Sequence, residues 1–257
     1  MLSFASSTAN PRRPFNGGGK ARDPHRAYIR RRKSSHGGTS RMQRAVIVDF
    51  GGVLVRSEDP SPREALAREL GLAVEDLERL IFASDLSLRA QRGELPEPEF
   101  WKAIGERLGI RSPEKIQQVR QRFFAGDRLN APLVEALRQW KGQVALGLIS
   151  NAWSGLREVL RHLGLLDLFD AVVISAEVGL LKPDPRIYLL ALERLRVPPQ
   201  ATAFVDDLPE NVQAARALGL CGIHFRDTRE ALQRLQEWLN GWRPMEERDH
   251  AAGDPSG

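Results

Sequence analysis

The chain has 257 residues, 42% of them apolar, and a formal net charge of +5. These values fit a globular protein that holds one large domain, or a core with a second domain inserted. No apolar run approaches the roughly 18 residues that a membrane span needs, so we expect no membrane partner. Cys221 is the only cysteine, which excludes an internal disulfide and favours a reducing, cytoplasmic location.

The charge is uneven along the chain. Residues 1–44 hold 11 Lys/Arg and one acid, whereas the remainder holds 27 Lys/Arg and 32 acids. The body is therefore mildly acidic, which argues against a specific nucleic-acid partner. Residues 1–43, rich in Arg, Gly, Ser and Pro, predict a disordered basic tail, and residues 241–257 predict a polar C-terminal tail.

Three interpretations of the basic tail stay open. It can be an arm that binds polyanions non-specifically, or a targeting peptide rich in Arg and Ser. It can also result from an upstream start, with Met42 as the true initiator directly before the first strand, and we favour this interpretation.

The first predicted strand, Ala45 to Val48, is a short apolar run that ends at Asp49. Two glycines, Gly51 and Gly52, follow closely and allow the chain to turn tightly. A carboxylate at the carboxyl end of such a strand lies where open α/β sheets bind their ligands. An ordinary turn residue has the same appearance, so the later segments decide between the two interpretations.

Residues 57–126 show helical periodicity with no strand-like run. We expect an all-helical insert there, between two core segments at 44–56 and 127–240. Four helical stretches are expected, beginning near Ser61, Val74, Pro98 and Ser112.

Beyond Asn130, helical and strand-like segments alternate regularly. Such alternation predicts an α/β fold in which a Rossmann-like parallel sheet carries helices on both faces. The expected strands after the first are Val144–Ile149, Ala171–Ile174, Ala203–Val205 and Leu220–Phe225.

Polar side chains follow three of these strands, as Asp49 follows the first. Because the carboxyl ends of parallel strands share one edge of a sheet, we expect these groups to converge on one crevice. The set comprises three carboxylates, a hydroxyl, an amide and an ammonium, supplied by Asp49, Ser150, Asn151, Lys182, Asp206 and Asp207.

This set of groups suits phosphoryl transfer. Clustered carboxylates repel one another unless a cation lies among them, and hard oxygen ligands favour Mg²⁺. Lys182 would neutralise the remaining charge, and Ser150 with backbone N–H groups at the next helix start would hold phosphate oxygens. Asp49 could then attack phosphorus and form an aspartyl-phosphate.

Each group also has a simpler interpretation. Ser150 can cap the following helix, and Lys182 can be a solvated loop residue. Asp206 and Asp207 can be ordinary turn acids, although two such acids at a strand end are costly without a cation. Asn151 can contact the nucleophile or only its own turn.

With these motifs in this order, the chain resembles the haloacid dehalogenase-like hydrolase superfamily over about residues 44–240. The resemblance implies that the helical insert is a C1-type cap and that Asp49 is the nucleophile. It further implies that Ser150, Asn151 and Lys182 bind substrate, the catalytic residues being Asp49, Ser150 and Lys182. The implied ligands of Mg²⁺ are Asp49, the Gly51 backbone and Asp207, with Asp206 nearby or acting through a water.

One position departs from the family pattern. Most phosphatases of the family carry an acid/base aspartate two residues after the nucleophile, where this chain has Gly51. A carboxylate of the insert, Glu58, Asp59 or Asp85, is a candidate substitute. We therefore expect a Mg²⁺-dependent phosphatase of a small phosphorylated metabolite, such as a sugar phosphate, with a good leaving group.

Two alternatives remain beside this expectation. The first is a metal-free haloacid dehalogenase in which Asp49 attacks carbon. The second is a catalytically impaired protein of the same fold, because Gly51 cannot supply the acid/base group. The insert helices are generic amphipathic segments, so they identify neither the substrate nor an oligomeric state.

Overall fold

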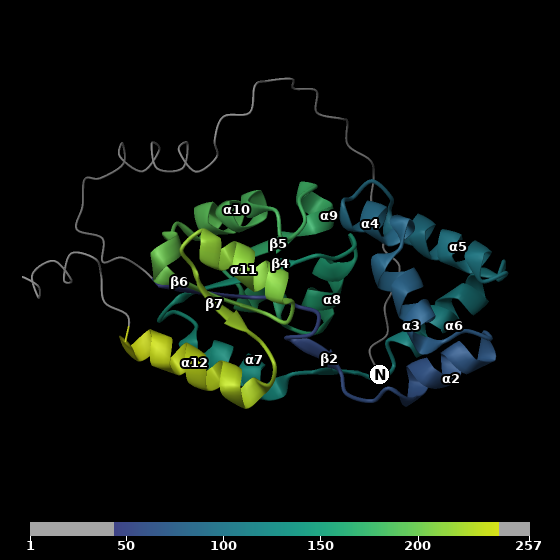
Figure 1. The fold of residues 1–257 in the computed structure, drawn as a ribbon, viewed down its shortest axis with the longest axis horizontal. Helices are drawn as coiled ribbons and strands as arrows, with labels where there is room; N and C mark the ends of the chain where they lie inside the picture. Colours follow the sequence, from purple (N-terminus) through teal and green to yellow (C-terminus); the bar gives the residue numbers. More distant parts are fainter. Residues whose placement is uncertain (1–43, 242–257) are drawn as a thin grey trace, which may run out of the picture. The chain divides into compact units, whose positions relative to one another are not determined.

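The structure is a computed structural model that describes residues 44–241. Its centre is a five-stranded parallel sheet in the order β5-β4-β1-β6-β7 (Figure 1). The predicted tails lie almost wholly outside the described residues. Among the described helices, none is both long and apolar enough to cross a bilayer. The strands of the sheet are β1 (Ala45–Val48), β4 (Ala145–Ser150), β5 (Ala171–Ile174), β6 (Thr202–Asp206) and β7 (Cys221–His224).

Helices cover both faces of the sheet, because successive strand side chains point to opposite sides. In β1, Val46 and Val48 join one buried apolar cluster, and Ala45 and Ile47 join another. The first cluster is completed by α7, α8 and α12, and the second by α10 and α11 (Figure 1). The bounds are α7 (Ala131–Trp140), α8 (Leu156–His162), α10 (Pro185–Leu195), α11 (Pro209–Ala217) and α12 (Thr228–Gly241), with short helices η2 (Leu166–Leu168), α9 (Ser175–Val178) and η3 (Pro199–Ala201).

The predicted fold class is thus confirmed, and the predicted strands agree with the observed ones to within one residue at each end. The position of β1 is the feature that matters for function. Val48 pairs with Leu148 of β4 on one side and with Val205 of β6 on the other. The ends of these three strands therefore lie next to one another at the same edge of the sheet.

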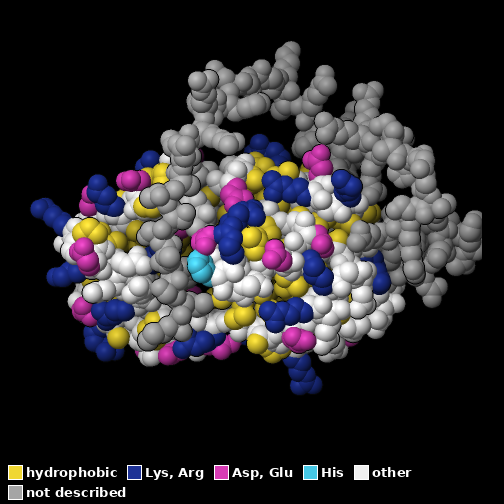
Figure 2. Space-filling view, turned by 180° about the vertical axis from the view of Figure 1, so that it is seen from behind, with side chains coloured by type: hydrophobic (Ala, Val, Ile, Leu, Met, Phe, Trp, Pro, Cys, Tyr) yellow, Lys and Arg dark blue, Asp and Glu magenta, His cyan; other side chains and the backbone are white. Residues whose placement is uncertain are grey.

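Charged side chains of both signs cover the surface of the described part of the chain. Figure 2 shows Lys and Arg interspersed with Asp and Glu over one face, rather than gathered by sign. This mixture fits the small net charge of the body that the sequence gives.

The segment between β1 and α7 is helical, as the sequence predicts, and its helices enclose an apolar cluster of their own. A further helix, α4, was not among the four expected stretches. Its start is capped by the Ser84 hydroxyl, which accepts a hydrogen bond from the Ser87 N–H at 3.2 Å. The helices are α2 (Ser61–Glu69), α3 (Val74–Glu78), η1 (Arg79–Ala83, a π-helical turn), α4 (Asp85–Gln91), α5 (Glu97–Arg107) and α6 (Pro113–Phe123).

A short antiparallel ribbon, β2 (Val55–Ser57) with β3 (Asp127–Leu129), joins the two ends of the helical segment and was not predicted. Beyond it, the N–H groups of Glu58 and Asp59 both donate to the Gly126 carbonyl at 3.2 Å. The two linkers are so close that a Cβ on Gly126 would lie 1.8 Å from the Asp59 carbonyl oxygen. The two linkers, residues 55–59 and 126–129, are therefore bonded to each other, and we call this pair of linkers the strap.

Arg63 fastens this strap to the helices. Its buried guanidinium bonds to Glu78 at 2.6 Å and to Asp127 of β3 at 3.2 Å. It also stacks over the Phe123 ring, with 4.2 Å between the guanidinium carbon and the ring centroid. One cation thus holds α2, α3 and β3 together.

Replacing this cation should destabilise the protein strongly. The Arg63→Met variant leaves the Asp127 carboxylate half-buried without its cation, so we expect unfolding to become easier by about 3 kcal/mol. The exposed Arg79–Asp76 pair is a matched control, and Arg79→Met should cost less than about 0.5 kcal/mol. Urea denaturation measures both, and equal effects of the two substitutions would contradict the assigned role of Arg63.

Candidate active site

Three carboxylates gather at the carboxyl edge of the sheet. Asp49, Asp206 and Asp207 each offer an oxygen, and these oxygens lie within 4.8 Å of one another. Asp49 directly follows β1, and its N–H continues the sheet by donating to the Val205 carbonyl at 2.9 Å. The sequence prediction that these strand ends converge is met for these three residues.

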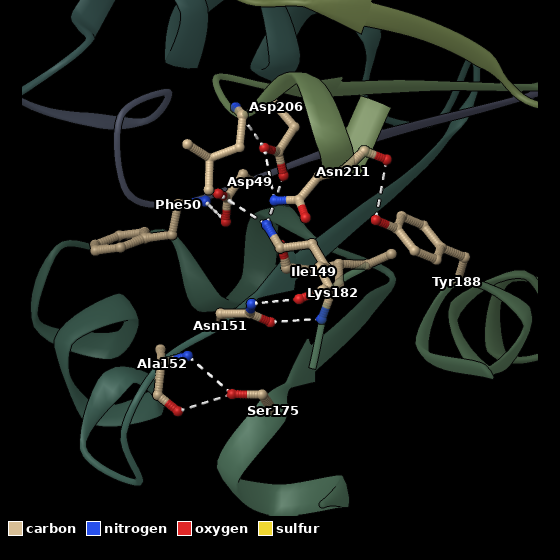
Figure 3. Close-up of polar contacts among 11 residues, drawn as sticks. Asp49, Phe50, Ile149, Asn151, Ala152, Ser175, Lys182, Tyr188, Asp206 and Asn211 are labelled. Atoms are coloured by element: carbon tan, nitrogen blue, oxygen red, sulfur yellow. Dashed lines mark hydrogen bonds and ion pairs between the residues drawn. The ribbon is translucent and has the colours of Figure 1, made fainter. Parts of the chain in front are cut away.

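Lys182 lies between two of the carboxylates (Figure 3). Its ammonium is 2.8 Å from Asp49 Oδ2 and 2.6 Å from Asp206 Oδ2, and it donates to the Ile149 carbonyl at 3.2 Å. Only 4% of the residue is exposed. The interpretation of Lys182 as a solvated loop residue is therefore wrong, and all three of its N–H donors have acceptors.

The burial of these charges alters their protonation. Burial raises the pKa of the Asp49 carboxyl to about 6, against the opposing effect of the Lys182 ammonium. Burial, followed by the negative charge of Asp206, also raises the pKa of Asp207. For Lys182, burial favours the neutral amine, but Asp49 and Asp206 together outweigh it and the pKa rises. Lys182 thus stays a cation at neutral pH.

Asn151 bonds to the backbone of Lys182 rather than to Asp49. Its side-chain amide donates to the Lys182 carbonyl at 2.9 Å and accepts from the Lys182 N–H at 2.8 Å (Figure 3). The next residue, Ala152, is held in the same way by the Ser175 hydroxyl, at 2.9 Å from its N–H and 3.1 Å from its carbonyl. The loop after β4 is therefore fixed to the loop that carries Lys182.

Ser150 is the last residue of β4 and is 4% exposed. It does not cap the next helix, because α8 begins at Leu156 and its N-cap residue is Gly155. For the same reason, the N–H groups closest to Ser150 belong to a five-residue loop and not to a helix start, which corrects our expectation. Ser150 ends β4 directly after Ile149, whose carbonyl accepts from Lys182, so the residue lies at the same edge of the sheet.

Asp206 is wholly buried and accepts three hydrogen bonds. Besides Lys182, it accepts hydrogen bonds at 2.9 Å from the Leu208 N–H and from the Asn211 amide. The Tyr188 hydroxyl in turn donates to the Asn211 carbonyl at 3.0 Å (Figure 3). Neither Asn211 nor Tyr188 is among the site residues that the sequence predicts. Asp206 is thus a support for Lys182, while Asp207 remains half-buried at the edge.

The two glycines that follow Asp49, Gly51 and Gly52, have different surroundings. Gly52 has φ +73°, and a Cβ there would lie 2.3 Å from Asp207 Oδ2. A side chain at Gly52 would therefore displace the Asp207 carboxylate. A Cβ on Gly51, in contrast, would meet nothing within 4 Å.

Two of the carboxylates suggested as substitutes for the missing acid have other partners. Asp59 accepts from the Ser61 hydroxyl at 2.6 Å, and Asp85 is paired with Arg107 at 2.8 Å. Glu58 is exposed on the linker after β2. The structure therefore ties Asp59 and Asp85 into the helical segment instead of releasing them toward Asp49.

The charge balance of the cluster suits a cation. Three carboxylates share one ammonium, so a surplus of negative charge is concentrated in a largely buried space. Oxygen donors of this kind fit a hard divalent ion such as Mg²⁺, and a cation would lower the raised pKa values of the carboxyls again. Asp206 already accepts three hydrogen bonds and is wholly buried. Asp49 accepts two, from Lys182 and from the Phe50 N–H at 2.7 Å, and Asp207 is half-buried at the edge, so Asp49 and Asp207 are better placed to hold a cation.

The amino-acid sequence is similar to the sequences of known hydrolases. Residues 43–219 match the sequence model of the haloacid dehalogenase-like hydrolases. The chain is 30% identical over 196 residues to the sesquiterpene phosphatase astK of Aspergillus oryzae, covering 76% of this chain and 95% of that protein. It is 31% identical over 192 residues to a phosphorylated carbohydrates phosphatase of Thermotoga maritima, covering 70% and 83%.

A solved structure of similar fold is a HAD family enzyme of Bacteroides thetaiotaomicron in complex with magnesium and inorganic phosphate. The TM-score is 0.62 at 20% identity, over 74% of this chain and 98% of that one. At this level of identity the similarity establishes a shared fold.

Proposed function

The chain belongs to the haloacid dehalogenase-like hydrolases, and on that premise we propose that it is a Mg²⁺-dependent phosphatase of a small phosphorylated metabolite. The observation that carries the proposal is the Lys182 ammonium bonded to Asp49 and Asp206 beside the Asp207 carboxylate. A phosphate group requires such a cation, and a nucleophilic carboxylate requires a charged neighbour that keeps it ionised.

Two relatives support the phosphate ester as the substrate class. Both are named phosphatases, one for sesquiterpenes and one for phosphorylated carbohydrates. The substrates in these two names both carry a phosphate, but they differ in the organic group to which it is attached. We therefore assign the phosphate to the strand-end cluster and the choice of leaving group to the helical segment, which we propose to act as a cap.

Asp49 and Asp207 would hold the Mg²⁺ ion, together with the Gly51 backbone carbonyl. When bound, the ion supplies positive charge that screens the phosphate from the carboxylates. Asp206 would act indirectly, because its oxygens already accept from Lys182, Leu208 and Asn211.

Each residue of the site then has a separate role in the reaction. An Asp49 oxygen attacks phosphorus, the ester P–O bond breaks, and the leaving-group oxygen departs with the electron pair. Lys182 and Ser150 hold the non-bridging oxygens of the phosphate. To do so, the Lys182 ammonium gives up one of its two carboxylate contacts and binds a phosphate oxygen instead. Water then cleaves the aspartyl-phosphate, releasing inorganic phosphate and restoring Asp49.

The leaving group needs a proton that Gly51 cannot donate. An alkoxide of high pKa departs slowly without a general acid, whereas an anomeric sugar or aryl oxygen departs more readily as an anion. We therefore propose that the natural substrate has a good leaving group, and a sugar phosphorylated at the anomeric carbon meets this requirement.

The nucleophile can be tested with the Asp49→Asn variant and p-nitrophenyl phosphate. With Mg²⁺ present, we expect the turnover number to fall on the order of 10³-fold or more, because an amide does not attack phosphorus. Treatment of the unaltered protein with EDTA should also abolish turnover, and added Mg²⁺ should restore it. Activity that resists EDTA, on a 2-haloacid instead of a phosphate, would establish the dehalogenase alternative. Zero turnover on a panel of phosphate esters would establish the impaired alternative.

The metal site can be tested through Gly52. The Gly52→Ala variant places a methyl group against Asp207, so we expect the affinity for Mg²⁺, measured by calorimetry, to fall by about 10- to 100-fold. Gly71→Ala is the matched control, since Gly71 has φ +68° and open space around its Cβ position. It carries the same backbone strain, and its Mg²⁺ affinity should stay within about twofold of the original. Equal affinities in the two variants would remove Asp207 from the metal site.

The missing acid can be tested by restoring it. The Gly51→Asp variant has room for its side chain, so we expect turnover of alkyl phosphates to rise by about 10- to 100-fold while that of p-nitrophenyl phosphate changes little. Gly51→Asn, which fills the same space without a titratable proton, is the control. A rise of equal size in both variants would show that the gain does not come from proton transfer.

A further inference from the structure

Trp153 lies in a loop of the core sheet in the sequence, but its side chain contacts the helical segment. It lies in the five-residue loop between β4 and α8, three residues after Ser150. Its side chain, however, packs against the apolar cluster of α2 to α6. The rings that it contacts, all from that segment, are Phe82, Phe100, Trp101 and Phe124 at centroid distances of 6.4, 4.6, 5.5 and 6.3 Å.

The indole also has a polar contact with the same segment. Its N–H donates to the Ser87 hydroxyl of α4 at 3.4 Å. Ser87 is fully buried and in turn donates to the Phe82 carbonyl at 3.1 Å, at the π-helical turn. The tryptophan is therefore seated by ring packing and by a hydrogen bond that fixes its orientation.

The end of the loop touches the helical segment at a second point. Gly155 lies so close to Glu97 of α5 that a Cβ there would be 2.0 Å from the Glu97 carboxylate. Glu97 is itself buried and is held by the Trp101 N–H and by Arg120. Since Glu97 has these partners, the loop meets a fixed surface rather than a mobile side chain.

The start of the same loop holds the catalytic lysine. Asn151 bonds twice to the Lys182 backbone, and Ala152 bonds to the Ser175 hydroxyl and to the Ala176 N–H. Ala176 also meets the helical segment, because a Cβ on Gly93 would lie 2.2 Å from its carbonyl oxygen. Over three residues, Asn151 to Trp153, the chain thus passes from the Lys182 backbone to the interior of the helical segment.

From this continuity we propose that Trp153 is a positioning residue, which makes the geometry of Lys182 depend on the docking of the helical segment. With the indole seated, the loop holds Asn151 against Lys182. With the indole withdrawn, the loop loses its outer attachment, and the lysine loses the neighbour that fixes its backbone. The kinetic part of this inference rests on the proposed phosphatase function, and the structural part does not.

The experiment compares the full chain with Trp153→Ala, Trp153→Phe and Trp140→Ala. Trp140 is the matched control. Like Trp153 it is half-buried, but it packs against the apolar cluster of the core sheet and not against the cluster of the helical segment. The first measurement is hydrogen exchange of the Lys182 N–H by NMR. We expect exchange about tenfold faster in Trp153→Ala, since the Asn151 acceptor becomes mobile, and no such change in Trp140→Ala at equal global stability.

The second measurement is steady-state kinetics with p-nitrophenyl phosphate and Mg²⁺. In Trp153→Ala, kcat should fall by about 10- to 100-fold with KM changed less than about threefold, as expected of a misplaced catalytic group. Trp153→Phe keeps a ring in the cluster and should recover most of kcat.

The results can separate this inference from the proposed function. If the unaltered protein hydrolyses no phosphate ester, the proposed phosphatase function is wrong. The hydrogen exchange of the Lys182 N–H then still tests whether the helical segment is coupled to Lys182 through Trp153. If Trp153→Ala exchanges the Lys182 N–H as slowly as Trp140→Ala does, the coupling is overturned. A loss of kcat that merely follows the fraction of unfolded protein in both variants would overturn it too.

Discussion

The structure depends on one buried cation that serves two carboxylates. Placing Asp49 and Asp206 in a dry sheet edge would be prohibitively costly without Lys182, because each charge loses its hydration. The remaining lone pairs and protons must then be satisfied by hydrogen bonds. Ile149 accepts from the ammonium, and Leu208 and Asn211 donate to Asp206. The sheet order supplies this arrangement, since β1 lies between β4 and β6.

Much of this could be predicted from the sequence, because the prediction needed only local patterns and one rule of topology. Short apolar runs separated by helical segments define a parallel sheet, and such a sheet brings its carboxyl ends to one edge. Asp49, Asp206 and Asp207 each stand at the end of such a run, so their meeting followed without any knowledge of tertiary contacts. Lys182 lies eight residues beyond β5, and the same rule of topology placed it at this edge because its segment follows that strand.

What could not be predicted depends on contacts between segments that are distant in sequence. The strands β2 and β3 are three residues long, too short for any periodicity, and they form only because the linkers are held side by side. The pairing of Asn151 with the Lys182 backbone spans 31 residues, so the local sequence favoured a turn equally well. Trp153 stands in a loop without periodic neighbours, where nothing in the sequence indicates that its ring enters the helical segment.

The adjacent glycines show how sterics and chemistry constrain a site differently. Gly52 is required by shape, since its left-handed backbone and the Asp207 carboxylate leave no room for a side chain. Gly51 has no such restriction, because open space surrounds its Cβ position. The fold would therefore accept an aspartate at position 51, so its absence is not required by the structure. In the proposed reaction, Gly51 supplies no proton to the leaving group, and a substrate with a good leaving group needs none.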